Sequence, residues 1–343
     1  MKMSDNVNFE KIIKTEKRKK WLKTIAVSGA ATVIIGGSVF YAIHKQVGIQ
    51  MAKQASKQQR QFNIDDLISS PNIISTSQYF SMTKTTQSTL KSDREKNIDG
   101  YRVAYPEKNV TFNTHGVESA YAQTPKIYNK NPATKEIIAT NRQSQQKEPL
   151  FFNVKYEHAY QSEKDKKELL ASSIPTHEAE TLSQLSNTLG EVSITFDKRY
   201  SYDDIRQMMP ENVMINYYWL GIHSDKLDTM SAAGSYIGLN ASDDGTGKLT
   251  EGAEVKAGKN DFSGYQGLKS ALEQQSGQRT VNDIDIAKDG QRQMSKNLKT
   301  AKFAGVIVTG RTQNLAKLDN QKYTFATNVG VTTPIMPYQA PIK

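Results

Sequence analysis

The pattern of hydrophobic positions is dominated by one uncharged run, from Thr24 to Ile43. In a helix that rises about 1.5 Å per residue, this run extends ~30 Å, the thickness of the hydrocarbon core of a bilayer. Trp21 and Tyr41 stand at the positions of an aromatic belt. The pattern therefore predicts a transmembrane helix over 21–45, with a tail before it and a much larger part of the chain after it.

A cleaved signal peptide is the alternative for this segment. Signal peptides have a shorter apolar region that is followed by a small-x-small cleavage site. Here the run ends in Phe40-Tyr-Ala-Ile-His44, which fits such a site poorly. A buried core helix is also disfavoured, because a basic cluster directly abuts the run. We therefore expect a retained membrane anchor.

Beyond the anchor, the pattern changes from helical to alternating. Residues 46–60 are polar and helix-favouring, and they predict a stalk that extends the membrane helix. Residues 62–160 contain short alternating runs between prolines and glycines, which is typical of a β-rich membrane-proximal region. Less regular patterns predict a strand over 150–156 and short helices over 162–172 and 181–189.

The C-terminal part contains two similar series of strand, short helix and strand. They cover 191–196, 202–209 and 213–220, and then 303–309, 312–318 and 322–327. In the first series Ser201 is a candidate helix cap, with Asp204 in the capping-box position. A polar loop over 242–261 and helices over 265–275 and 281–300 lie between the two series.

This repeat predicts an extracellular α/β (α+β) domain with two β-α-β units. The expected core is a mostly four-stranded sheet with helices on one face, for which a ferredoxin-like arrangement is one candidate. The predicted regions are a basic tail (1–20), a transmembrane helix (21–45), a stalk and β-rich region (46–160), the α/β domain (161–330) and an extended tail (331–343).

Charge gives the anchor a direction. The residues up to Lys23 include eight Lys or Arg and three acidic residues, so they carry +5 of the chain's net +10. Cytoplasmic flanks collect positive charge, and we therefore expect a single-pass protein of the cell membrane with a cytoplasmic N-terminus and an extracellular C-terminal domain. The basic cluster also suits anionic lipid; its members are Lys17, Arg18, Lys19, Lys20 and Lys23. This flank accounts for most of the basic balance, so no nucleic-acid partner is predicted.

Candidate chemistry is sparse. The chain has no cysteine, which excludes disulfides, thiolate zinc sites and a cysteine nucleophile, and which fits the outer face of a Gram-positive bacterium. The segment 243–248 lacks the first glycine and the final hydroxyl residue of a phosphate loop. Calcium-loop spacing from Asn240 to Glu251 is faint, and a solvated turn is the preferred interpretation. No histidine pair has the spacing of a helical zinc site. We predict neither an enzyme nor a cofactor.

The tail has an apolar face. Phe9, Ile12 and Ile13 are spaced i, i+3 and i+4, and Glu10 forms an i, i+4 pair with Lys14. One interpretation is a short helix that binds in a groove of a soluble partner. The alternative is an interfacial helix whose apolar stripe enters lipid, and the sequence alone favours that alternative.

Small residues recur within the apolar run. Ser28, Thr32 and Gly36 form a small-xxx-small row, which permits close packing against a second copy or another membrane protein. The alternative is the ordinary enrichment of glycine in membrane helices.

Two segments resemble a known family. The first is Phe9-Glu-Lys-Ile-Ile-Lys14 with the basic stretch up to Ile25, and the second comprises 191–219 and 303–318, including Gly305-Val-Ile-Val-Thr-Gly310. They are similar to the N- and C-terminal regions of the sigma factor regulators of Firmicutes, which are membrane-bound anti-sigma factors. The likeness rests on hydrophobic patterns and covers the tail, the anchor and about residues 170–330.

The resemblance implies a signalling function. The cytoplasmic part would hold an extracytoplasmic-function sigma factor away from RNA polymerase. The outer domain would sense the envelope, as in envelope stress, or contact a second membrane protein. Some members have a longer cytoplasmic region, so here the membrane or a partner would complete the sigma site, or direct sigma binding would be lost. The alternative function is an envelope binding or scaffold protein, anchored by a basic tail without sigma-factor binding.

Overall fold

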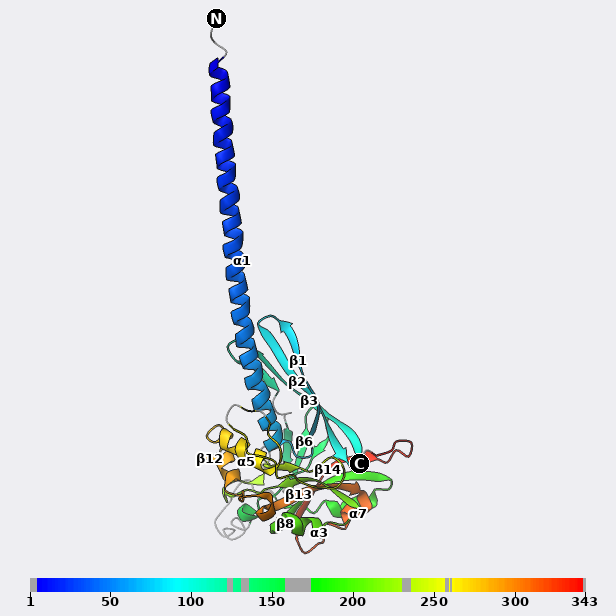
Figure 1. The fold of residues 1–343 in the computed structure, drawn as a ribbon. Helices are drawn as coiled ribbons and strands as arrows, with labels where there is room; N and C mark the ends of the chain where they lie inside the picture. The colour runs from blue at the N-terminus through cyan, green and yellow to red at the C-terminus, as the bar shows by residue number, and fades with distance from the viewer. Residues whose placement is uncertain are drawn as a thin grey trace.

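The computed structural model consists of one long helix that projects from a β-rich body (Figure 1). It describes residues 5–121, 126–130, 136–157, 174–229, 236–256, 259 and 261–341. The predicted helix over 162–172 lies outside these residues.

The long helix, α1, runs without a break from Asp5–Ser69. Its 65 residues correspond to ~97 Å at the helical rise of about 1.5 Å per residue. Within the described part of the chain, α1 alone is long and apolar enough to cross a membrane, judged by length and composition. The predicted anchor and stalk are therefore two parts of one helix, which continues nine residues beyond the predicted end of the stalk at Arg60.

Two small antiparallel sheets follow α1, as the alternating pattern predicts. The first has the order β1-β2-β3-β4 and the second the order β5-β6-β7. The β2–β3 turn is a two-residue hairpin at Asp99 and Gly100, whose positive φ angles of 54° and 89° match the twist of the flanking strands. The bounds are β1 (Ile74–Lys84), β2 (Gln87–Ile98), β3 (Tyr101–Asn113), β4 (Val117–Tyr121), β5 (Lys126–Lys130), β6 (Ile137–Asn141) and β7 (Lys147–Glu148).

The C-terminal part is built on a five-stranded sheet with the order β10-β9-β13-β8-β14, in which all neighbours are antiparallel. The helix α3 links β8 to β9 across β13, and α7 links β13 to β14 across β8. The sheet has one strand more than predicted, because β10 pairs with β9. The bounds are β8 (Thr188–Ser201), α3 (Tyr202–Met208), β9 (Val213–Trp219), β10 (Gly238–Asn240), β13 (Lys302–Arg311), α7 (Thr312–Ala316) and β14 (Thr324–Pro334).

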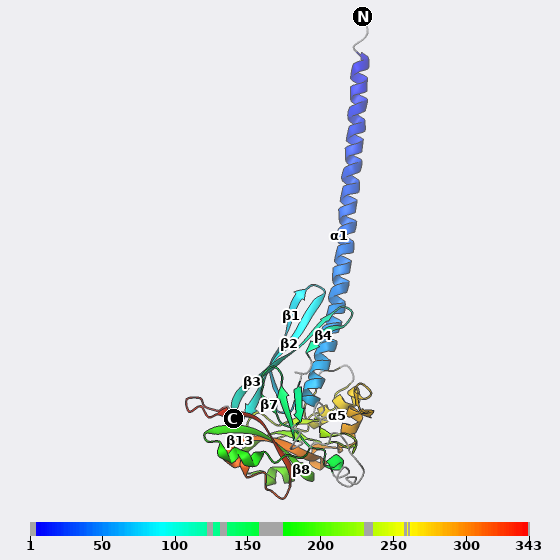
Figure 2. The same cartoon turned by 180° about the vertical axis from the view of Figure 1, so that it is seen from behind.

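Both faces of this sheet are buried. On the face away from α1, the ring of Tyr218 lies 5.5 Å from that of Tyr202 at the start of α3. On the opposite face, Phe151 stacks on Trp219 with ring centroids 4.5 Å apart. Figure 2 shows the same layering from behind, with the small sheets and the end of α1 above the five-stranded sheet.

Local signals explain some of these elements. The predicted capping box is confirmed, because the Ser201 side chain accepts from the Asp204 backbone N–H and the Asp204 side chain reciprocates. The helix predicted over 265–275 is confirmed as α5 (Gly264–Gln275).

Three predicted elements are wrong. The strand predicted over 150–156 is absent: residues 154–157 are helical, and the backbone N–H groups of 150–152 donate to side chains of Asn328, Tyr236 and Thr195 instead of a neighbouring strand. The helix predicted over 181–189 is a 3₁₀ turn, η1 (Ala179–Gln184), after which β8 begins.

The single helix predicted over 281–300 is replaced by a hairpin and two short helical pieces. Asn282 and Asp283 have positive φ angles of 47° and 62°, which form a tight turn that a helix cannot contain. The pieces are β11 (Thr280–Val281), β12 (Ile284–Asp285), α6 (Ile286–Gln291) and η2 (Leu298–Thr300).

Candidate functional site

The junction between α1, the small sheets and the five-stranded sheet contains the strongest polar constellation. Here α1 ends at Ser69, and the chain turns through Asn72, which has a φ of 52°. The backbone N–H of Asn72 donates to Oδ1 of Asn240 at 2.8 Å, and Nδ2 of Asn240 donates to the carbonyls of Ser70 and Ile73. The end of α1 is thereby attached to β10.

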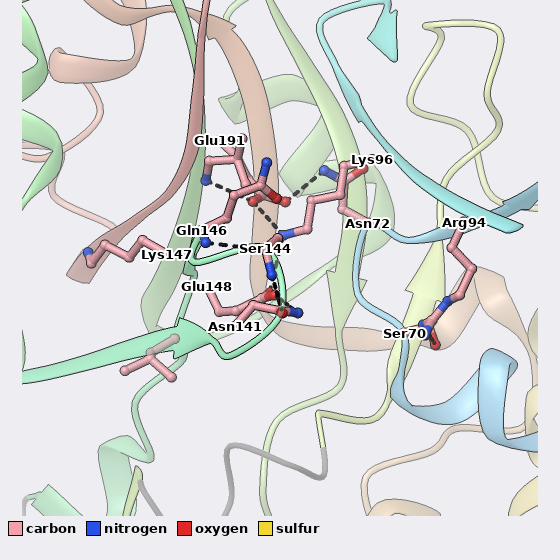
Figure 3. A network of polar contacts seen from close by, with 12 residues as sticks. Ser70, Asn72, Arg94, Lys96, Asn141, Ser144, Gln146, Lys147, Glu148 and Glu191 are labelled. Atoms are coloured by element: carbon pink, nitrogen blue, oxygen red, sulfur yellow. Dashed lines mark hydrogen bonds and ion pairs between the residues drawn. The ribbon is translucent and has the colours of Figure 1, made fainter. Parts of the chain in front are cut away.

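A buried ion cluster lies beside this turn (Figure 3). Nζ of Lys96 on β2 lies 2.8 Å from Oε2 of Glu191 on β8 and 3.3 Å from Oε2 of Glu148 on β7. These three side chains are at most 3% exposed. One ammonium therefore joins three strands that belong to three different sheets.

The electrostatics of the cluster favour the charged lysine. Burial by itself opposes the ammonium, but the carboxylates of Glu148 and Glu191 outweigh it and raise the pKa of Lys96 above its usual value. Burial and Glu148 likewise raise the pKa of Tyr105, whose ring lies 5.6 Å from the Lys96 ammonium. The lysine thus stays protonated throughout the physiological range.

The carboxylate of Glu191 accepts further hydrogen bonds from neighbouring groups. Nδ2 of Asn72 donates to its Oε1 at 2.7 Å, and the backbone N–H of Val331 donates to its Oε2 at 3.2 Å. A Cβ on Gly330 would lie 2.3 Å from this Oε2, so the close approach of β14 requires glycine at that position. Glu191 therefore contacts the turn after α1, the β2 lysine and β14 at once.

A second set of contacts extends the junction along β2. Nδ2 of Asn97 donates to Asp243 at 2.8 Å, and Arg102 forms an ion pair with the same carboxylate. Nδ2 of Asn216 on β9 donates to the carbonyl of Asn97 at 2.9 Å. The segment around Asp243 is an exposed turn, as predicted, and these contacts attach it to the small sheet.

A pocket of about 500 Å³ opens on the other side of the end of α1, between α1, α5 and α6. Its wall combines apolar side chains such as Leu272 and Ile286 with Gln61, Asp65 and Arg279. Burial raises the pKa of Asp65, an effect that the nearby charge of Lys108 opposes. This volume falls within the range of small-molecule sites.

The chemistry of the junction is that of a structural connection. Lys96 is paired with two carboxylates, and the junction residues named above include no nucleophile with an adjacent base. Within the described ranges, no group of three His, Asp or Glu side chains is arranged to hold a metal ion.

The predicted tail and membrane residues lie far from the junction, along α1. Phe9, Glu10, Ile12 and Ile13 are on its helical backbone, but their side chains lie outside the described part of the structure. The basic cluster Lys17, Arg18, Lys19, Lys20 and Lys23 is exposed.

The small-residue row is exposed on the apolar run of α1. The hydroxyl of Ser28 donates to the carbonyl of Thr24 at 2.8 Å, and that of Thr32 donates to the carbonyl of Ser28 at 2.9 Å. These bonds satisfy both hydroxyls within the helix. A Cβ at Gly36 would meet nothing within 4 Å, so the surface there is open.

Sequence reasoning missed the ion cluster. Glu191, Ser193 and Thr195 alternate with apolar residues, and this polar face was an available signal that β8 meets a second polar layer. Lys96 and Glu148 gave no comparable signal, because the paired residues are far apart in the sequence. Lys96 is 95 positions from Glu191 and 52 positions from Glu148.

Comparison with known proteins yields two family matches. Residues 10–103 match the sigma factor regulator N-terminal model, and residues 182–331 match the sigma factor regulator C-terminal model. Lys96 lies in the first match, Glu191 in the second and Glu148 between them. No curated protein and no solved structure matches the chain. The chain belongs to the sigma factor regulator family, whose members are regulatory rather than enzymatic proteins.

Proposed function

We propose that this protein is a single-pass membrane anti-sigma factor or sigma-factor regulator. Its N-terminus is cytoplasmic and its sheet domains are extracellular, in the cell membrane of a Gram-positive bacterium. It couples an extracytoplasmic signal, such as envelope stress, to an extracytoplasmic-function sigma factor. The observation that carries this proposal is the unbroken helix α1, which joins the tail to the buried junction.

The continuity of α1 supports a mechanical route for the signal. A helix bends sharply only where a proline, a glycine pair or an inserted group interrupts its hydrogen bonds. Gly36-Gly37 is the one glycine pair in α1. A signal that changes the packing at the junction would tilt or rotate α1 and shift the population of tail conformations. The five-stranded sheet is the sensing platform, and its strand order supports a ferredoxin-like plan.

The tail supplies the cytoplasmic contacts in this proposal. Phe9, Glu10, Ile12 and Ile13 bind the sigma factor, while the basic cluster holds the tail at anionic lipid. Ser28, Thr32 and Gly36 pack against a second copy or another membrane protein.

A capture experiment with the full-length protein tests the sigma contact. Phe9, Ile12 and Ile13 are replaced together by serine, and Lys11→Ala on the other face of the helix is the matched control. We expect mass spectrometry to identify a sigma factor with the wild type and the control, and at least a tenfold lower yield with the triple variant.

Two results would contradict the proposal. Equal capture by the triple variant would remove the tail from the interface. No sigma factor in any sample, together with unchanged sigma-dependent transcription after gene deletion, would favour the envelope scaffold instead.

A further inference from the structure

The four-stranded sheet lies alongside α1, and its strand β1 runs back toward the membrane segment (Figure 1). The hydroxyl of Ser75 donates to Asp66 at 2.7 Å, and Nε2 of Gln59 donates to Gln78 at 2.8 Å. The three strand residues from Ser75 to Gln78 span ~10 Å, and the seven helical residues from Asp66 back to Gln59 span the same ~10 Å. The two elements are therefore antiparallel and aligned along their lengths.

This alignment places the end of the β1–β2 hairpin. Six more strand residues, from Gln78 to Lys84, add ~20 Å, which corresponds to ~13 helical residues and reaches the level of Gln46. An independent contact agrees, because the core that contains Leu90, the cross-strand neighbour of Phe80, packs against Met51 and Ala55 of α1.

The hairpin end is therefore close to the membrane segment. The uncharged run of α1 ends at Ile43, only ~5 Å along the helix from the level of Gln46. The polar headgroup layer is ~5–8 Å thick on each side of a bilayer. A bilayer that encloses the run thus brings its headgroups to the hairpin.

The side chains at this end suit a lipid interface. Tyr79, Phe80 and Met82 are 44%, 41% and 74% exposed, and Lys84 is the one charged residue between Gln78 and Leu90. The β3–β4 turn lies beside them, because Gln87 pairs with Asn113, and it adds Val117, which is 50% exposed. Exposed aromatic and aliphatic side chains with a lysine are typical of the boundary between headgroups and acyl chains.

We propose that the ends of the β1–β2 and β3–β4 hairpins form a second membrane contact, in which Met82 and Val117, with Lys84 at the tip, reach the headgroup layer of the leaflet from which α1 emerges. The occupant of this apolar surface is lipid, because the register with α1 holds the surface at headgroup level. This contact fixes the tilt of the sheet domains relative to the bilayer. The inference rests on insertion of α1 into the membrane.

Single-cysteine labelling tests the contact, since the chain has no cysteine of its own. Full-length Met82→Cys, Val33→Cys and Ala104→Cys variants are labelled with an environment-sensitive fluorophore and reconstituted in phosphatidylethanolamine–phosphatidylglycerol vesicles. Ala104 is the matched control, because it is exposed on the same sheet at the level of Ile74, away from the hairpin end. Quenching by lipids with a shallow or a deep spin label is then compared.

We expect the label at position 82 to lose at least half of its emission with the shallow quencher and less with the deep one. The label at position 33 should respond most to the deep quencher, and the label at position 104 to neither. A quenched position 33 with an unquenched position 82 would overturn this inference and leave the anchor intact.

Two further results separate the remaining cases. An unquenched position 33 would overturn the anchor itself. Protection of position 82 from aqueous iodide without quenching by lipid would show that a protein covers the surface, which also overturns the inference.

Discussion

Lys96 is the shared counter-ion of the two buried carboxylates at the junction. Replacing it by methionine keeps much of the volume but leaves Glu148 and Glu191 buried without their counter-ion. Breaking a buried ion pair in this way costs about 3–5 kcal/mol. We expect Lys96→Met to lower the free energy of unfolding by this amount in urea titrations of the full chain in detergent.

A surface lysine on the same sheet provides the comparison. Lys91 lies 3.5 Å from Glu107, and both side chains are more than 30% exposed. Such a pair contributes about 0–1 kcal/mol, so Lys91→Met should change the urea midpoint little. An equal loss of unfolding free energy in Lys96→Met and Lys91→Met would mean that the buried cluster stabilises the fold no more than a surface ion pair.

Glu157 provides a pH-dependent test at the same scale. Burial, and then the charge of Asp228, raise the pKa of Glu157 from 4.5 to about 7, and its Oε1 has no hydrogen-bond partner among the described residues. Because the folded state holds this proton more tightly than the unfolded chain, the stabilisation is present at low pH and is lost as the pH rises from 4.5 to 7.

The Glu157→Gln variant removes this dependence. We expect it to unfold at a higher urea concentration than the wild type at pH 8, and at nearly the same concentration at pH 4.5. A wild type whose stability is constant between these two pH values would contradict the raised pKa.

At the scale of elements, the side chain of Asn240 makes the hydrogen bonds that join the turn after α1 to β10. Asn240→Ala removes the three hydrogen bonds that Asn240 makes with the turn at Ser70–Ile73. Because the residue is partly solvated, we expect a loss of about 1–2 kcal/mol and at least tenfold faster hydrogen exchange in that turn.

A nearby aspartate is the control for this variant. The carboxylate of Asp244 accepts from Thr246 within its own turn. Asp244→Ala should therefore leave exchange at the end of α1 unchanged, and an equal effect would indicate general loosening of the loop.

The elements differ in how well the sequence predicts them. The α3 helix was predictable because its capping box is local, between Ser201 and Asp204. The segment 150–153 was not, because its apolar pattern matches a strand while its backbone pairs with distant side chains. The turn at Asn282 and Asp283 was a local signal that the helical pattern around it obscured.

At the scale of the whole molecule, the long apolar helix and the family were predictable from continuous patterns. The ion cluster was not, because its three charges come together only when three sheets pack on one another. The tail contacts through Phe9, Glu10, Ile12 and Ile13 stay predictions, as does the packing of the small-residue row.

The length of the α1 stretch from Ile43 to Ser69 sets the distance between the apolar run and the junction. Its far end is fixed by the junction, and the hairpins beside it reach back to the level at which the apolar run stops. One inserted residue would move the apolar run by about 1.5 Å and rotate it by about 100° relative to the junction. Among relatives, lengthening of this stretch by about two residues should therefore accompany lengthening of each hairpin arm by about one.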